Sequence, residues 1–272
     1  SDWYDLLQLS WFEYQQLKLG IIKPSEKLIE RVSEKFSLNF EGLISGPIDY
    51  RALALRYEEP SKIISDTYVK AAYGRRRASI AAVNFLEKNV NWRLRLDAIR
   101  KLNISENFLQ DPFAPISMQF MTDLCDYLNQ RQFQKSDFFA MGAYTYEANK
   151  QGLMARIFSE LSSPKEAYEV FFQECMKFFE RNCSYSITQI NDTSLTFECL
   201  TDSHVAAESG MRHLGSIPVC QFKSGIIASI PCYLGLPISK IKEISCVHAG
   251  DSICRSEIDF SEARKLQLRL TS

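Results

Sequence analysis

Histidine is scarce in this sequence, and the patterns of common catalytic sites are missing. The 272 residues contain three histidines, His204, His213 and His248, and none lies between residues 151 and 203. The chain has no glycine-rich phosphate loop, no G-x-S-x-G elbow and no H-E-x-x-H pair. No acidic, histidine or cysteine residues have a spacing that forces catalytic geometry. We therefore expect a protein that is not an enzyme.

Long apolar runs and an excess of either charge are missing too. The longest apolar runs, such as residues 225–234, are far too short to cross a bilayer. The net charge is −1, so no global basic field attracts nucleic acid or anionic lipid. The first residues, Ser-Asp-Trp-Tyr-Asp, have neither the basic nor the apolar region of a signal peptide. These absences predict a cytoplasmic protein without a membrane partner.

Eight cysteines are present, and those that cluster are candidates for metal binding. Glu243, Cys246 and Cys254 form the pattern E-x2-C-x7-C near the end of the chain. We expect two antiparallel strands here, joined at Gly250 and Asp251, so that Cys254 returns beside Cys246. Glu243 lies three residues before Cys246, and a regular strand would place them on opposite faces. A bulge is therefore needed to bring both to one site.

A tetrahedral site needs a fourth ligand, and Cys220 can supply it from the start of a helix expected over residues 217–230. Three thiolates and a carboxylate suit zinc. Protein would then fill all four positions and leave none for a catalytic water, so the hypothesis is a structural zinc site. Cys232 and His248 are alternative ligands. The competing interpretation is that these cysteines are ordinary small residues of the core.

The rest of the chain alternates between expected helices and strands. The segments CSYSITQI and SLTFECL predict a hairpin that turns at Asn191 and Asp192. Helices are expected at residues 118–128, at 153–161 and from Pro164 onward, and a loop is expected to carry His204 and His213. The basic run at residues 75–77 is interpreted as a solvated helix face or a dimer contact, with phosphate binding as the alternative.

The segment CQFKSGIIASIPCYLGLPISKIKEISCVHAGDSIC resembles the end of the 4-vinyl reductase domain, most closely the version in phenol- and xylene-responsive activators. The resemblance spans residues 151–260. It implies a mixed α/β ligand-binding fold shared with haem nitric-oxide sensors and certain vesicle-trafficking subunits, and a dimer. It also implies a structural zinc bound by Cys220, Glu243, Cys246 and Cys254.

The pocket that this resemblance implies differs from that of the phenol sensors, which use a His and a Trp. Tryptophan occurs here only at positions 3, 11 and 92. We therefore expect a pocket of Phe, Met, Tyr and aliphatic side chains that holds an apolar molecule, either a lipid or an aromatic compound. The sequence does not predict which residues bind it.

The first 46 residues predict a small helical module. Ser25 is placed to cap a helix in which Leu28, Ile29, Val32 and Phe36 follow at helical spacing. With two short helices before it, this order resembles the lambda-repressor type of helix-turn-helix domain, whose first helix would precede Ser1. The resemblance makes residues 10–19 the recognition helix and turns five side chains toward DNA, namely Trp11, Glu13, Tyr14, Gln15 and Lys18.

Charge argues against DNA binding by this module. Residues 1–50 contain five Lys and Arg against eight Asp and Glu, and Glu13 would repel phosphate. A helical interaction module that does not bind DNA is therefore the alternative.

Together these patterns predict an α+β protein. It comprises a helix-turn-helix-like module (residues 1–46), linker helices with the first half of a sensor domain (47–150), a zinc-stapled ligand-binding domain (151–262) and a tail (263–272). The hypothesis is a cytosolic, dimeric transcription regulator whose sensor domain binds an apolar small molecule and controls the helical module. The alternatives are an interaction module of the same fold and a haem-based gas sensor with His204, His213 or His248 as axial ligand.

Overall fold

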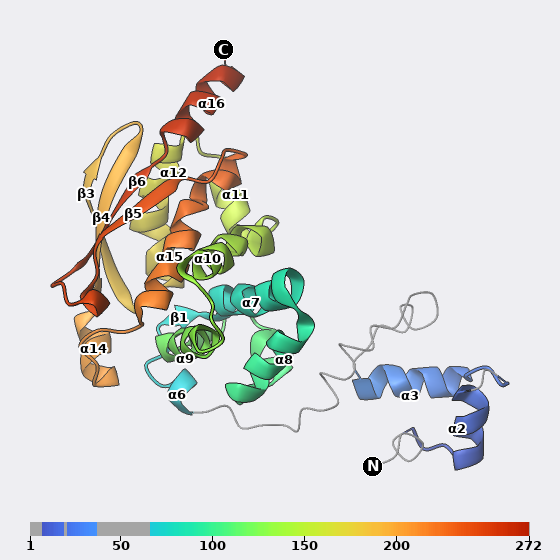
Figure 1. Ribbon diagram of the computed structural model, residues 1–272. Helices are drawn as coiled ribbons and strands as arrows, with labels where there is room; N and C mark the ends of the chain where they lie inside the picture. The colour runs from blue at the N-terminus through green and yellow to red at the C-terminus, as the bar shows by residue number, and fades with distance from the viewer. Residues whose placement is uncertain (1–6, 19–20, 37–65, 272) are drawn as a thin grey trace. The chain divides into compact units, whose positions relative to one another are not determined.

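The computed structural model describes residues 7–18, 21–36 and 66–271. The chain divides into two compact units, Ser1–Ser61 and Lys62–Ser272. Each unit is described by itself, and Figure 1 shows the elements of both.

The first unit contains two described helices, α2 (Trp11–Lys18) and α3 (Glu26–Phe36). Both are capped by serines, because Ser10 Oγ accepts from the Glu13 N–H at 3.2 Å and Ser25 Oγ accepts from the Leu28 N–H at 3.2 Å. The predicted cap at Ser25 is therefore confirmed. Residues 1–6, 19–20 and 37–46 of the predicted module lie outside the described residues.

One layer of the larger unit is a four-stranded antiparallel sheet (Figure 1). Its order is β3 (Cys183–Ile190), β4 (Ser194–Thr201), β6 (Cys254–Asp259) and β5 (Lys240–Ser245). Both predicted hairpins are confirmed, since β3 pairs with β4 and β5 with β6. The first turn closes as Asx chemistry dictates, with Asn191 Oδ1 accepting from the Thr193 and Ser194 N–H groups at 2.9 Å.

Helices form the rest of this unit, and those expected at residues 118–128, 153–161 and 217–230 are confirmed. The α-helices are α6 (Asp66–Val69), α7 (Arg76–Phe85), α8 (Trp92–Lys101), α9 (Met118–Asn129), α10 (Lys135–Asn149), α11 (Leu153–Ser159), α12 (Pro164–Val170), α13 (Met176–Phe179), α14 (Ser203–Ser209), α15 (Ile217–Ala228) and α16 (Ser261–Thr271).

Shorter elements connect the helices. Two π-helical segments, η1 (Leu86–Val90) and η3 (Phe171–Cys175), continue α7 and join α12 to α13; η2 (Glu106–Leu109), η4 (Ile230–Leu234) and η5 (Val247–Ala249) are 3₁₀ turns; β1 (Gly74–Arg75) pairs with β2 (Pro115–Ile116).

Helix α14 corrects one expectation, because the sequence predicted a loop there. The side chain of Asp202 accepts hydrogen bonds from the N–H groups of His204 and Val205, at 2.9 and 3.4 Å. This N-cap starts a helix of seven residues that places His204 in its first turn. The helical pattern of apolar residues is weak in this segment because only Val205 of the helix is buried.

Helix α15 contributes to both hydrophobic cores of the unit. One core lies among the helices and includes Leu124 and Phe222. The other includes Tyr168 and Ile258 and lies between the sheet and the segment formed by α12, η3 and α13. Phe222 and Ile227 of α15 belong to different cores. A movement of this helix would therefore change the packing of both cores.

Helices α10 and α15 cross with their backbones in contact. A Cβ added at Gly142 would lie 1.9 Å from the carbonyl oxygen of Phe222, and one added at Gly225 would lie 2.0 Å from that of Phe139. No side chain fits at such distances, so both positions require glycine. The crossing fixes where α15 passes over α10.

The stretch Ile217–Leu234, which is α15 followed by η4, is long and apolar enough by length and composition to cross a membrane, and it is the one such stretch among the described residues. Its apolar side chains, such as Phe222, Ile227 and Ile230, are buried in the two cores of the unit. This packing is that of a core helix.

Candidate functional site

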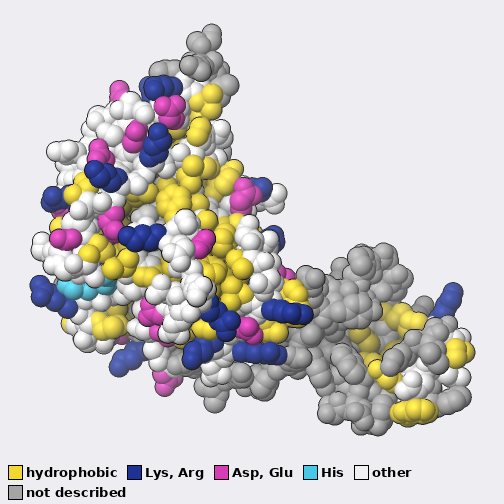
Figure 2. Space-filling view, in the orientation of Figure 1, with side chains coloured by type: hydrophobic (Ala, Val, Ile, Leu, Met, Phe, Trp, Pro, Cys, Tyr) yellow, Lys and Arg dark blue, Asp and Glu magenta, His cyan; other side chains and the backbone are white. Residues whose placement is uncertain are grey.

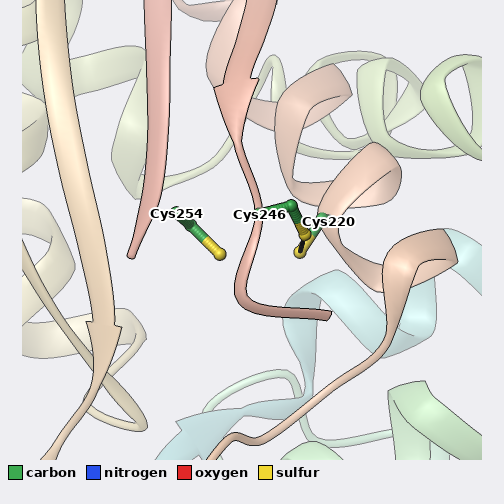
Figure 3. Close-up of side chains that lie close together, drawn as sticks. All are labelled: Cys220, Cys246 and Cys254. Atoms are coloured by element: carbon green, nitrogen blue, oxygen red, sulfur yellow. Dashed lines mark hydrogen bonds between the residues drawn. The ribbon is translucent and has the colours of Figure 1, made fainter. Parts of the chain in front are cut away.

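Three cysteines converge where the β5–β6 hairpin meets the start of α15. The Sγ atoms of Cys220, Cys246 and Cys254 all lie within 4.8 Å of one another, and those of Cys220 and Cys246 are 3.8 Å apart. Figure 3 shows the side chain of Cys254 pointing from its strand toward the other two. The sequence predicted that these three cysteines would meet, and the structure brings them together.

The turn between β5 and β6 holds two of these cysteines in position. The N–H of Cys246 donates to Oδ2 of Asp251 at 2.8 Å, and the N–H of Val247 donates to Sγ of Cys254 at 3.4 Å. Gly250 has a φ of 103°, a conformation that a residue with a Cβ adopts only with strain. The Gly-Asp pair therefore shapes the loop that points both thiols inward.

Hydrogen bonding divides the protons unequally among the three thiols. A hydrogen bond from the Cys220 thiol, helped by the N–H of Val247, lowers the pKa of Cys254 to about 6. The same bond raises the pKa of Cys220, and burial raises the pKa of Cys246. Near neutral pH the cluster therefore contains one thiolate held by thiol and amide donors, which is the chemical form that binds soft metal ions.

The spacing of the sulfur atoms fits a tetrahedral metal ion. Zinc–sulfur bonds of about 2.3 Å at tetrahedral angles place two sulfur atoms roughly 3.8 Å apart. The separation of the Cys220 and Cys246 sulfurs is 3.8 Å. The cluster could thus hold a metal ion with small adjustments of its third cysteine.

Glu243, one of the four predicted ligands, is not in this group of three. The register of β5 on β6 shifts between Glu243 and Ser245, which is the bulge that the sequence required. Even so, Oε2 of Glu243 accepts a hydrogen bond from Nε2 of Gln221 at 3.3 Å. Glu243 and His248 line the same small cavity as Cys220 and Cys254, so both stay candidates for the fourth position. Cys232 lies in η4 and is not in the cluster.

A second site is an apolar cavity of about 130 Å³ in the larger unit. It is lined mainly by apolar side chains of α9, α13, α15 and their neighbours, among them Met121, Met176, Phe222, Ile226 and Tyr233. On the face drawn in Figure 2, hydrophobic side chains gather over the middle of this unit, where Figure 1 has α10 and α15. The cavity is the expected kind of site for an apolar molecule.

Polar groups at the cavity wall lack partners. Asn182 is 1% exposed, and its Oδ1 has no hydrogen-bond partner among the described residues. The buried hydroxyl of Tyr185 and Nη1 of Arg77 also lack a partner there. Buried polar atoms are nearly always paired with protein or water. Their position at a cavity indicates that a bound molecule or water would satisfy them.

The basic run at residues 75–77 does not form a solvated helix face, which was one of its two interpretations; the other, a dimer contact, stays a prediction. The Arg76 guanidinium donates to the carbonyl of Phe108 at 2.6 Å and lies 3.9 Å from the centre of the Phe108 ring. Arg77 lies 4.4 Å from the centre of the Phe179 ring and lines the cavity. The charge of the arginines favoured a solvent-exposed position, but their aromatic partners come from distant segments of the chain and hold the guanidinium groups against the protein.

None of the described residues that line the apolar cavity is a histidine. Nε2 of His204 is 3.0 Å from the hydroxyl of Tyr73. His248 lies beside the cysteine cluster, where burial lowers its pKa.

The residues proposed to face DNA lie on α2. The Trp11 side chain is 60% exposed, and Tyr14 and Gln15 are half-buried. Glu13 Oε2 accepts from the N–H and the hydroxyl of Ser10, at 2.9 and 2.7 Å, so this carboxylate completes a capping box. The side chain of Lys18 lies outside the described residues. Glu13 thus has a structural role, whatever α2 contacts.

No sequence pattern indicated the polar residues that line the cavity. Arg77, Asn149 and Asn182 come from three distant segments, and none belongs to a motif. The one available signal was the basic run at the start of a helix, where the helix dipole disfavours positive charge.

Solved structures of H-NOX proteins share this fold. One from K. algicida, in its unliganded Fe(II) form, is 9% identical with a TM-score of 0.50, and the match covers 68% of this chain and 95% of that chain. One from S. oneidensis, in its Fe(II)NO form, is 8% identical with a TM-score of 0.51, covering 68% and 98%. Identity this low speaks for the fold alone. It confirms the predicted α+β fold resembling the haem-nitric-oxide-binding domain.

Neither a protein-family model nor a curated protein matches the sequence. The resemblances to the 4-vinyl reductase domain and to the lambda-repressor helix-turn-helix therefore stay predictions.

Proposed function

We propose that the unit Lys62–Ser272 is a sensor domain, without catalytic activity, that binds a small apolar molecule in its cavity. The cavity carries this proposal, because it is lined by apolar side chains yet contains polar atoms without partners. A cavity of about 150 Å³ in another protein takes up benzene. A volume of about 130 Å³ therefore favours a molecule the size of one ring over a long acyl chain.

Helix α15 is the element by which binding would be sensed. It lines the cavity with Phe222, Ile226 and Ile227, and it carries Cys220 of the cysteine cluster at its start. A ligand that moves α15 would thus also displace the hairpin that holds Cys246 and Cys254. A conformational change of this kind requires that the ligand bind one arrangement of α15 more tightly than another.

The cysteine cluster is proposed to bind structural zinc. Three thiolates with a fourth protein ligand, Glu243 or His248, would leave no open position for a reacting water. Zinc would tie α15 to the β5–β6 hairpin and stabilise the end of α15 that faces the sheet.

Haem, which binds to H-NOX domains, does not fit this cavity. None of the described residues that line it is a histidine that could serve as axial ligand. Its volume of about 130 Å³ is also below the roughly 300–1,000 Å³ of pockets for drug-sized ligands, and haem is at least of that size. The H-NOX-like fold is therefore proposed to serve a different ligand here.

For the whole chain, we propose a cytoplasmic, homodimeric transcription regulator in which the sensor domain controls DNA binding by α2 and α3. The exposed Trp11 supports a contact surface on α2. The excess of acidic residues in the first 50 favours a second candidate, a module that binds protein instead of DNA. Selection of binding sites from random DNA separates the two: enrichment of one sequence supports the regulator, and no enrichment supports the interaction module.

Native mass spectrometry of the full chain tests the sensor proposal. The wild-type protein is expected to carry a small organic molecule, zinc and a second copy of itself. Ala78 is half-buried and lines the cavity, so Ala78→Leu fills space that the ligand needs. This variant should lose the organic molecule, keep zinc and gain about 1 kcal/mol of stability. Retention of the molecule by Ala78→Leu would exclude the cavity as its site.

A further inference from the structure

Arg77 is held at the cavity wall by neutral groups. Its Nε and Nη2 both donate to Oδ1 of Asn149, at 3.1 and 2.7 Å, and its guanidinium lies over the ring of Phe179. Asn149 is itself fixed, because its Nδ2 donates to the carbonyl of Thr145 at 2.7 Å. The guanidinium is thus positioned by an amide and an aromatic ring, and Nη1 remains buried without a partner.

No carboxylate balances this charge among the residues that the structure describes. Burial lowers the pKa of Arg77. The groups that oppose this effect are Tyr233 and Cys175, and neither is a carboxylate. Arg77 also lies in the first turn of α7, where the helix dipole favours negative charge and where α7 has no acidic residue. A half-buried cation whose Nη1 is buried without a partner is costly to keep, so its retention indicates a use.

Glu180 is the one acidic residue among the described residues that line the cavity, and Asn182 occupies its carboxylate. Oε1 of Glu180 accepts from the N–H and Nδ2 of Asn182, at 2.9 and 2.7 Å. Lys223 also lines the cavity, and its Nζ lies 3.1 Å from Sγ of Cys183. With Arg75, Arg77 and Lys223 against Glu180, the charged residues lining the cavity have an excess of positive charge. The apolar wall and this excess together describe a molecule with an apolar body and an anionic end.

We propose that the cavity binds a small apolar carboxylate, about the size of one ring, whose carboxylate pairs with Arg77. This inference rests on the proposed sensor function and specifies its ligand class. The apolar body would fill the space beside Met176, Phe222 and Ile226, and a carboxylate oxygen would accept from the guanidinium. Charge-assisted hydrogen bonds of this kind are the strong ones when water is excluded.

Calorimetric titration of the full chain with two probes tests the carboxylate site. Benzoate and benzyl alcohol are similar in size, but only benzoate is charged. Wild-type protein should bind benzoate roughly 10- to 100-fold more tightly than benzyl alcohol. Arg77→Met should remove this preference and leave benzyl alcohol binding within about threefold, since the apolar wall is unchanged. Arg76→Met is the matched control: Arg76 neighbours Arg77 and also stacks on a ring, but it does not line the cavity.

Each outcome decides between the two levels of the proposal. Equal affinity of wild-type protein for both probes overturns the carboxylate site and leaves the apolar cavity standing. No binding of either probe overturns both. If Arg77→Met keeps the preference for benzoate and Arg76→Met loses it, the anion pairs with another residue. That result overturns the role of Arg77. If Arg77→Met does not fold, the wild-type preference and the more conservative Arg77→Lys, which keeps the charge and should keep part of the preference, still decide the question.

Discussion

The cysteine cluster and the apolar cavity both depend on α15, yet they balance their polar groups in opposite ways. In the cluster, the thiols contact one another and a backbone N–H donates to Cys254. At the cavity, none of the described residues supplies a counter-ion for Arg77, and the Oδ1 of Asn182 has no partner among them. A site whose groups satisfy one another suits a permanent structural ion. A site that leaves groups unsatisfied gains most when a ligand arrives.

The largest effect should come from breaking the helix crossing that both sites share. Gly225→Ala puts a Cβ 2.0 Å from the carbonyl oxygen of Phe139, so α10 and α15 must separate. We expect a loss of more than about 3 kcal/mol in the free energy of unfolding, seen as a fall in Tm of roughly 10 °C. Both metal and ligand binding should weaken.

Gly210→Ala is the control for this change. Gly210 has a φ of 71°, but no atom lies within 4 Å of an added Cβ. It should therefore cost about 1 kcal/mol through backbone strain alone and spare both sites. Equal losses for the two variants would mean that the crossing is less tight than the distances indicate.

The next largest effect should separate the two sites. Cys246→Ser removes a ligand of the proposed zinc site while leaving the cavity lining intact. Zinc at a thousandfold above its Kd stabilises the wild-type protein by about 4 kcal/mol, and the variant should lose that response in chemical unfolding with and without a chelator. Cys232→Ser, a half-buried cysteine outside the cluster, should respond like wild type. A zinc response that survives in Cys246→Ser would place the metal elsewhere.

The smallest effect concerns the protons released by the metal site. With a pKa of about 6, Cys254 is already ionised at pH 8, whereas Cys220 and Cys246, whose pKa values are raised, keep their protons. Metal binding requires thiolates, so about two protons should leave at pH 8 and about three below pH 6. Zinc titrations in buffers of different ionisation enthalpy measure this number. Release of three protons at pH 8 would show that Cys254 is an ordinary thiol.

The parts of the molecule that local chemistry determines could be predicted from sequence. The Asn191 turn, the Ser25 cap and the hairpin that returns Cys254 beside Cys246 each follow from a few neighbouring residues. Cys220 joined them because the start of a helix lies next to that hairpin. Glu243 was harder to place, since a bulge brings the strand into position but a glutamine of α15 holds the carboxylate.

The cavity could not be predicted, because its residues are joined only by tertiary packing. Asn149 is 72 residues from Arg77, and Phe179 lies on yet another helix. A run of arginines is usually solvated, and no local signal told that these aromatic and amide partners would cover them. The unbalanced charge of Arg77 depends on these tertiary neighbours, so no sequence pattern indicates it.

The glycine crossing also determines what kind of motion can travel through this protein. With no side chain between the backbones at Gly142 and Gly225, α15 has a fixed point on α10. Cys220 lies five residues before Gly225, about 7.5 Å along the helix axis, and Ala228, the last residue of α15, lies about 4.5 Å beyond it. We expect a displacement of one end of α15 to tilt the helix about Gly225, so that its other end moves in the opposite direction. A signal could then pass without any change in how tightly the two helices are joined.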